Sequence, residues 1–177
     1  RVIYDTTDIS SQLNDYRALT YVFAYNSAKY LYVGSEAPFN NLWFDMAAMN
    51  AVATNSSVSL WYGAAWVAAV DIVDETKVST ASLSKSGRLS FTSNIESGWD
   101  QEQDSADVTG LSGTAIYNMY WARIAWSANL TASTEIKYLG QKFAVDTDLY
   151  SFYPDLDRLY RDRISTWGAG RRDVELA

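Results

Sequence analysis

The stretch IYNMYWARIAW, from Ile116 to Trp126, decides the fold. Its aromatic and β-branched side chains fit the pleated surface of a β-sheet better than they fit a helix. Successive residues of a strand face opposite sides of the sheet, and both alternating sets in this stretch are substantially apolar. One set is Ile116, Tyr120, Ala122, Ile124 and Trp126, and the other is Tyr117, Met119, Trp121 and Ala125. A strand that is apolar on both faces is covered on both faces, and we expect the cover to be a C-terminal helix or a neighbouring subunit.

Similar runs precede and follow this stretch, and turn signals separate them. They are rich in Tyr, Val, Phe and Trp and recur at intervals of roughly 8–15 residues, as in β-sandwiches and barrels. We therefore predict a mainly β domain over residues 1–145, an antiparallel β-sandwich or jelly-roll-like domain of about eight or nine strands. Besides the stretch quoted above, the predicted strands are residues 16–25, 29–33, 42–44, 57–62, 66–73, 88–92, 134–139 and 142–145.

Two segments of this domain depart from the strand pattern. Asp45 stands where it can cap a short helix of Ala and Met residues at 46–52. Residues 93–114 contain scattered glycines and an acidic string but no apolar periodicity. A segment of that length without a pattern predicts a surface loop, which Trp99 ties to the domain.

The character of the chain changes after Val145. Five apolar residues then fall on one face of a predicted helix, and three arginines lie largely off that face. The apolar residues are Leu156, Leu159, Tyr160, Ile164 and Trp167, and the arginines are Arg158, Arg161 and Arg163. We predict that residues 146–177 form a C-terminal helical arm. Its apolar stripe docks either on its own domain or on a neighbouring copy.

Charge and composition exclude several classes of function. The chain has a net charge of −7, which disfavours direct binding to nucleic acid or to an anionic membrane. It contains no His and no Cys, so Ser-His-Asp and Cys-His catalysis and ordinary zinc and haem sites are excluded. No glycine-rich phosphate-binding loop occurs. We therefore expect a protein that is not an enzyme and that holds no cofactor or metal.

The carboxylates leave two alternative functions open, hydrolysis of glycosides and binding of calcium. Asp71, Asp74 and Glu75 lie close enough in sequence to supply the pair of acids that a glycosidase needs. Hard cations such as calcium also bind carboxylate oxygens, and one acidic string offers four of them. These four residues are Asp100, Glu102, Asp104 and Asp107. Because the string lacks the glycine and the terminal Glu of a calcium loop, a solvated acidic loop is the favoured interpretation. For the first three acids the favoured interpretation is that they solvate a strand end and its turn.

The aromatic residues favour binding of other macromolecules. Aromatic side chains and arginine are enriched at the energetic centres of protein interfaces. The candidate partner-interface residues are Tyr117, Trp121, Arg158, Leu159, Tyr160, Arg161, Ile164 and Trp167. The alternative is a carbohydrate-binding module that recognises host-surface glycans on a row of exposed rings. The candidate rings are Trp43, Trp61, Trp66, Trp99 and Trp121.

Several short motifs follow one another in an informative order. They are LYVGS at 31–35, PFNNLWFD at 38–45, LWYGAAW at 60–66, SGRLSF at 86–91, YWARI at 120–124 and DLYSFYPDL at 148–156. In this order they resemble a family of tailed-bacteriophage virion proteins with β-sandwich subunits. Tyr62-Gly63-Ala64 departs from the Asn-Gly turn expected in that family. This departure concerns the local hairpin more than the resemblance as a whole.

The resemblance implies a structural role without catalytic residues. It implies a ring-forming subunit of the neck or head-tail connector, or a tail or capsid-decoration subunit. Its partners would then be other copies of itself and other virion proteins, and it would assemble into the virion in the cytoplasm of the host bacterium.

Overall fold

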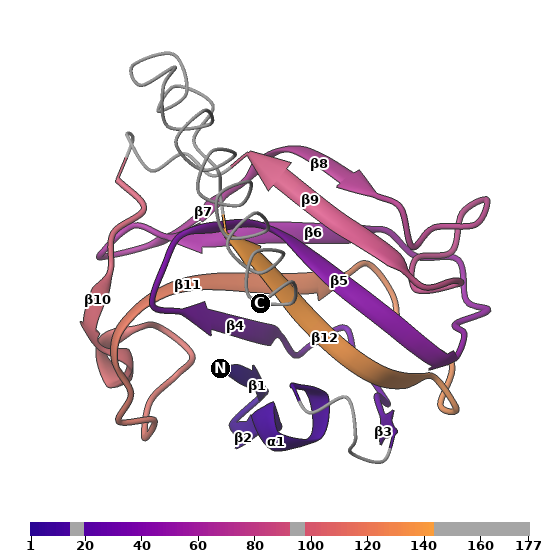
Figure 1. The fold of residues 1–177 in the computed structure, drawn as a ribbon, viewed down its shortest axis with the longest axis horizontal. Helices are drawn as coiled ribbons and strands as arrows, with labels where there is room; N and C mark the ends of the chain where they lie inside the picture. Colours follow the sequence, from indigo (N-terminus) through magenta and orange to yellow (C-terminus); the bar gives the residue numbers. More distant parts are fainter. Residues whose placement is uncertain (15–19, 93–97, 144–177) are drawn as a thin grey trace, which may run out of the picture. The chain divides into compact units, whose positions relative to one another are not determined.

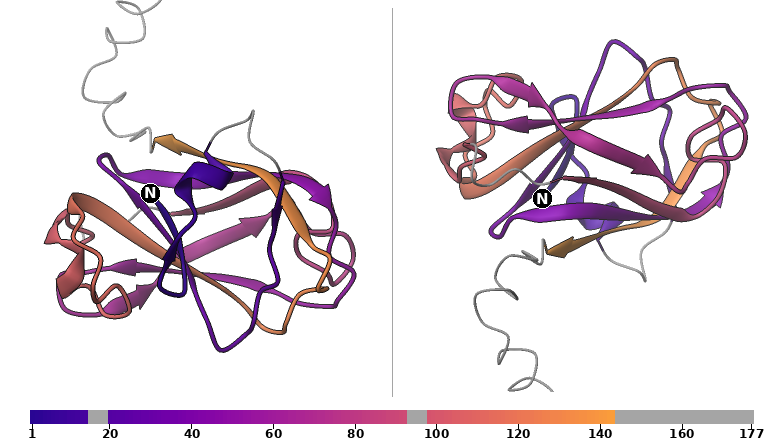
Figure 2. Two further views of the ribbon diagram at one scale, coloured as in Figure 1. Left: turned by 90° about the horizontal axis from the view of Figure 1, so that it is seen from below. Right: turned by 90° about the horizontal axis from the view of Figure 1, so that it is seen from above.

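Two antiparallel β-sheets stack on each other in the computed structural model, which describes residues 1–14, 20–92 and 98–143 (Figures 1 and 2). The strands of the first sheet are β1 (Val2–Tyr4), β2 (Thr7–Asp8), β4 (Leu31–Ser35), β6 (Ser56–Trp61), β7 (Trp66–Ala68), β10 (Glu102–Asp104) and β11 (Tyr117–Trp126). Those of the second are β3 (Tyr21–Val22), β5 (Phe39–Ala48), β8 (Val70–Asp74), β9 (Gly87–Thr92) and β12 (Glu135–Phe143). The predicted antiparallel sandwich is thus confirmed.

The chain passes repeatedly between the two layers. Within the described residues, the seven-stranded sheet has the order β2-β1-β4-β11-β6-β7, with β10 also paired to β11, and the five-stranded sheet has the order β3-β12-β5-β9-β8. The stretch that decides the fold lies between β4 and β6, where Ala122 pairs with both Val33 and Leu60. Two short helices, α1 (Ser10–Leu13) and the 3-10 helix η2 (Ser105–Asp107), lie in the connections.

The main core lies between the sheets and is largely aromatic. Trp126 of β11 meets Phe23, Tyr25 and Phe44 edge-on, with ring centroids 5.5, 4.9 and 6.3 Å away. Edge-to-face contacts of this kind contribute about 0.5–1.5 kcal/mol each beyond the burial of apolar area. Tyr25 is further fixed by the backbone N–H of Trp126, which donates to its hydroxyl at 3.0 Å.

A second buried cluster covers the outer face of the seven-stranded sheet. Tyr32, Trp61 and Trp121 are buried there beneath Val108 and Leu111. These last two residues come from the connection between β10 and β11. The expectation that a C-terminal helix or a neighbouring subunit covers this face is therefore wrong for Trp121, because the connection that precedes β11 covers it. Trp99 is fully buried and its Nε1 donates to the carbonyl of Trp121 at 3.1 Å, so the predicted anchoring of this loop by Trp99 is confirmed.

The predicted helix at residues 46–52 is wrong. Residues 46–48 continue β5, and Met46 is buried opposite Ile136 of β12. Asp45 does not cap a helix, because its carboxylate accepts a hydrogen bond from Ser86 Oγ at 3.1 Å. Pairing with a distant strand and burial of Met46 outweigh the weak helix preference of a short run of Ala and Met.

Several strand boundaries also differ from the prediction, among them the run predicted at 16–25, whose described part contains only the short strand β3 (Tyr21–Val22). Residues 134–139 and 142–145 were expected as two strands, but β12 runs without a break through Gly140 to Phe143. The single run predicted at 66–73 divides at Ala69 into β7 and β8, which belong to different sheets. The connection predicted as a loop at 93–114 contains β10 and η2. The predicted arm at 146–177 lies outside the described residues.

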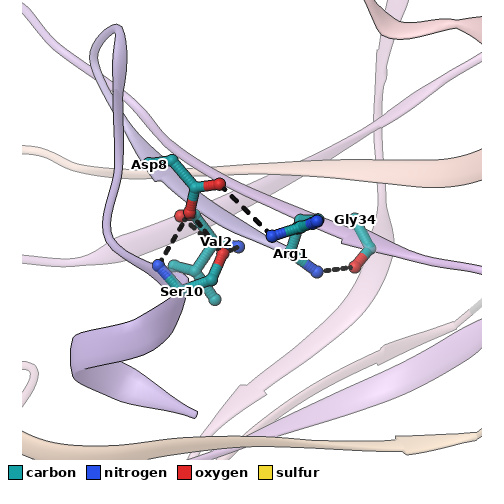
Figure 3. Close-up of polar contacts among 5 residues, drawn as sticks. All are labelled: Arg1, Val2, Asp8, Ser10 and Gly34. Atoms are coloured by element: carbon teal, nitrogen blue, oxygen red, sulfur yellow. Dashed lines mark hydrogen bonds and ion pairs between the residues drawn. The ribbon is translucent and has the colours of Figure 1, made fainter. Parts of the chain in front are cut away.

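The first residues form an additional hairpin that local sequence did not predict. β1 pairs with β4, so that Val2 lies opposite Val33. Figure 3 shows how this hairpin is held: Asp8 accepts hydrogen bonds from the backbone N–H and the hydroxyl of Ser10, at 2.9 and 2.5 Å. The hydroxyl of Ser10 in turn accepts from the N–H of Val2 at 2.8 Å, and Arg1 lies 3.5 Å from the Asp8 carboxylate.

Candidate functional site

A shallow groove of about 240 Å³ lies on the outer face of the five-stranded sheet. Asn41, Trp43, Glu75 and Arg88 line it. Alternation along β5 places Asn41 and Trp43 on this face, while the neighbouring Leu42 is fully buried in the core. Trp43 is 44% exposed, so much of the indole is open to solvent.

Trp43 has a small neighbour on one side and a charged one on the other. It lies opposite Gly140 of β12 and opposite Arg88 of β9. The space above Gly140 is occupied by the ring of Tyr138, since a Cβ at position 140 would lie 2.8 Å from Tyr138 Cε1. Trp43 and Tyr138 therefore share one face of the sheet, on adjacent strands at diagonal positions.

An ion pair forms the opposite wall of the groove. Arg88 Nη2 donates to Glu75 Oε1 at 2.7 Å, and both side chains are about half exposed. The backbone holds the pair in register, because the N–H of Glu75 donates to the carbonyl of Arg88 at 2.7 Å. Gly87 makes this close approach possible: a Cβ there would lie 2.7 Å from the carbonyl oxygen of Glu75.

The edges of the five-stranded sheet form a second candidate surface. β8 is the outermost strand on one side, and its Val70 and Val73 are each 53% exposed. β3 is the outermost described strand on the other side, and it exposes Val22. Edge strands are commonly protected by charged side chains, above all Lys; residues 64–74 contain no Lys or Arg, and the charged side chains of β8 are those of Asp71 and Asp74.

A bulge at Asp71 also protects the β8 edge. Asp71 adopts a positive φ of 53°, and the register with β9 shifts between Val70 and Val73. Its carboxylate accepts a hydrogen bond from Thr92 Oγ1 at 2.9 Å. A bulge of this kind interrupts continuous strand pairing. Contact with a partner at this edge is therefore expected through the valine side chains more than through an extended hydrogen-bond ladder.

The predicted interface residues are separated by the structure. Tyr117 is 62% exposed at the start of β11, and it stays a prediction as an interface residue. Trp121 cannot contact a partner directly, because it is fully buried within the chain. The remaining candidates, Arg158, Leu159, Tyr160, Arg161, Ile164 and Trp167, lie outside the described residues.

The predicted row of exposed tryptophans does not form. Trp61, Trp99 and Trp121 are buried, and Trp66 is half-buried with its Nε1 donating to the carbonyl of Thr109 at 2.9 Å. Among the described tryptophans, Trp43 alone exposes a large part of its ring. The sequence alone did not distinguish Trp43 from the buried tryptophans. The distant connection between β10 and β11 determines which sheet face is covered.

Acidic residues considered as glycosidase or calcium-binding candidates accept hydrogen bonds that stabilise turns and tertiary contacts. Asp74 accepts hydrogen bonds from the N–H and the hydroxyl of Thr76, at 2.9 and 2.5 Å. In the acidic string, Glu102 accepts from Trp61 Nε1 at 3.0 Å, and Asp104 caps η2. Within residues 1–14, 20–92 and 98–143, no three His, Cys, Asp or Glu residues group as metal ligands.

The groove residues Asn41 and Arg88 and the exposed edge valines were missed as functional candidates, and Glu75 was considered only as a member of a glycosidase acid pair. The pairing of Trp43 with Arg88 is set by strand register between distant segments, so no local signal predicts it. The β8 edge had a readable signal, because the run from Ala64 to Asp74 combines valines with a lack of basic residues.

No protein-family model, curated protein or solved structure matches this chain. In the part of the chain that the structure describes, no helix has the length and apolarity needed to cross a membrane.

Proposed function

We propose that this chain is a non-catalytic structural subunit of a tailed-bacteriophage virion that assembles with copies of itself into a ring, at the neck or head-tail connector. The observation that carries the proposal is the exposure of valine side chains on both edge strands of the five-stranded sheet. Val22 is exposed on β3 and Val70 and Val73 on β8, at opposite ends of the strand order.

Two different edges on one subunit favour head-to-tail contact. When one surface of a subunit binds a different surface of the next, the contact is heterologous, and it closes into a ring if the rotation permits. Exposed valines on both edges give such a contact apolar side chains to bury. The aromatic Tyr117, exposed at the start of β11, lies in the first sheet and is a further contact candidate.

The motif resemblance supports the same proposal. Five of its six motifs lie within the described residues, and each contributes to a strand of the sandwich. LYVGS is β4, PFNNLWFD enters β5, LWYGAAW joins β6 to β7, SGRLSF covers β9 and YWARI lies in β11. The resemblance thus rests on the residues that build the layers.

The test is the native mass of the purified chain over a range of concentrations. We expect a discrete assembly of several 19.8 kDa copies. Replacing Val70 and Val73 together by Lys adds two charges to the edge and should convert the assembly to monomers. The matched control is Val78→Lys, at a residue of similar exposure, 52%, that lies outside the named strands.

Three outcomes would contradict the proposal. The first is a monomer at every concentration, the second is an assembly that survives the double Lys variant, and the third is an equal loss of assembly in the Val78→Lys control. Circular dichroism of each variant checks that the sandwich is still folded.

A further inference from the structure

We propose that the groove beside Trp43 binds one uncharged hexopyranose unit of a glycan. The site is independent of ring assembly, since it occupies the open face of the five-stranded sheet while the proposed subunit contact uses its edges. The groove offers a platform for stacking, a set of polar groups beside it, and a space whose size and charge suit one sugar ring.

The platform is the exposed indole of Trp43. A pyranose ring presents a patch of C–H groups on one face, and the face of an aromatic ring is a fitting apolar surface for it. Trp43 is 44% exposed on a central strand, and the ring of Tyr138 occupies the space above its cross-strand neighbour Gly140. Tyr138, on the same face of β12, adds a second aromatic side chain next to the groove.

The polar groups beside Trp43 are of the kind that can hydrogen-bond to neighbouring hydroxyls of a sugar ring. The guanidinium of Arg88 carries five N–H donors, and the carboxylate of Glu75 has two acceptor oxygens. Their single ion-pair contact is Arg88 Nη2 to Glu75 Oε1, which leaves further donor and acceptor positions. Adjacent sugar hydroxyls both donate and accept hydrogen bonds, so a donor and an acceptor side by side match them. Asn41 also lines the groove, and its Nδ2 donates to Asn40 Oδ1 at 2.7 Å.

Size and charge narrow the class of ligand. Pockets for drug-sized molecules have volumes of about 300–1,000 Å³, so a groove of about 240 Å³ suits one ring and not a longer buried ligand. Arg88 and Glu75 neutralise each other, so the groove has no charge excess to select a phosphate or a cation. An uncharged ring with neighbouring hydroxyls meets both conditions.

The test uses the indole N–H signals of the whole chain in a proton–nitrogen NMR spectrum. The probes are methyl β-D-glucopyranoside, methyl β-D-galactopyranoside and methyl N-acetyl-β-D-glucosaminide, and the Trp43→Phe variant assigns the Trp43 signal. A single ring with few contacts binds weakly, with a Kd on the order of millimolar. We expect at least one probe to shift the Trp43 signal in a saturable manner.

Variants and a polyol control make the test specific. Trp43→Ala should abolish binding, seen as loss of ligand saturation-transfer signal, and Arg88→Gln should weaken it at least several-fold. Tyr117→Ala, at another exposed aromatic residue, should leave it unchanged. Sorbitol, an open-chain polyol without a ring face, should not shift the Trp43 signal.

The inference is overturned if no pyranoside shifts the signal, if sorbitol shifts it equally, or if Trp43→Ala binds like the parent chain. These outcomes are separate from the fate of the proposed function. Loss of sugar binding leaves the native mass unchanged, and a monomeric chain can still bind a pyranoside.

Discussion

At the scale of single residues, the absence of a side chain can matter as much as its presence. Gly34 of β4 lies opposite Trp121 of β11, and a Cβ at position 34 would lie 2.7 Å from the indole ring. We expect Gly34→Ala to lower the free energy of unfolding by about 1–3 kcal/mol, the usual cost of overpacking a filled core. Urea denaturation followed by fluorescence measures this.

The matched control for this prediction is a smaller ring at position 121. Trp121→Phe makes room above Gly34, so the combined variant should lose less stability than the sum of the two single variants. Strict additivity of the two losses would show that the glycine is not required by the indole.

Asn50 is a buried polar residue that joins three segments. Its Nδ2 donates to the carbonyls of Val52 and Ser82, and its Oδ1 accepts from the backbone N–H of Thr131 at 3.0 Å. Asn50→Ala leaves these groups without partners, so we expect a loss of about 2–4 kcal/mol in unfolding free energy. Asn129→Ala removes one exposed hydrogen bond, to the N–H of Ser27, and is the control with the smaller expected loss. Similar losses in both variants would contradict a special role for Asn50.

Residue types alone did not separate exposed from buried aromatics. Trp43 and Trp121 both lie within strands, yet the first is 44% exposed and the second is fully buried. The difference comes from the connection between β10 and β11, whose Val108 and Leu111 cover only the first sheet. Burial of this kind depends on contacts between distant segments, so alternation within a strand predicts two faces but not which one stays open.

At the scale of elements, the sequence predicted most central strands and failed where the local residue preference was weak or disagreed with the pairing. The alternation at 88–92 and the apolar run at 116–126 correspond to β9 and β11. Residues 46–48 were predicted as helix because their local preference was the only visible signal, whereas their pairing with β12 joins segments some 90 residues apart. The hairpin of β1 and β2 was missed for the same reason, since β1 depends on β4.

The N-terminal hairpin has a testable dependence on pH. Partial burial raises the pKa of Asp8, but the two hydrogen bonds from Ser10 and the nearby Arg1 outweigh it and lower the pKa below its usual value. The folded state therefore favours the ionised carboxylate. This contribution is fully present above the unfolded pKa of about 3.9 and is lost as the pH falls through the lower folded value.

We expect the stability difference between the parent chain and Asp8→Asn to shrink as the pH falls below about 4. Because Asp8 is about half exposed and screened by solvent, the difference near neutral pH should be no more than about 1 kcal/mol. Urea denaturation between pH 3 and 6 measures it. A difference that stays constant over this range, or one that grows towards low pH, would contradict the assigned role of the carboxylate.

At the scale of the whole molecule, the described residues complete a core without the predicted arm. The buried hydrophobic residues extend from Val2 to Leu139, and the strands up to β12 build both sheets. A chain that ends after Val145 should therefore fold. The apolar stripe and flanking arginines predicted at 146–177 should then serve contacts between subunits, which is one of the two docking roles that the sequence left open.

Deleting residues 146–177 should leave the sandwich folded but abolish assembly into a ring. The reason is that a stripe of Leu159, Tyr160, Ile164 and Trp167 offers more apolar area to a neighbour than the edge valines alone, and interface energy concentrates in such aromatic residues. Near-ultraviolet circular dichroism and the midpoint of thermal unfolding report on the fold, and native mass reports on assembly. Replacing Leu159 and Ile164 by Ser in the full chain tests the same stripe without truncation. If the shortened chain assembles normally, the edges suffice and the arm has no part in ring formation; if it unfolds, the stripe belongs to the subunit's own core.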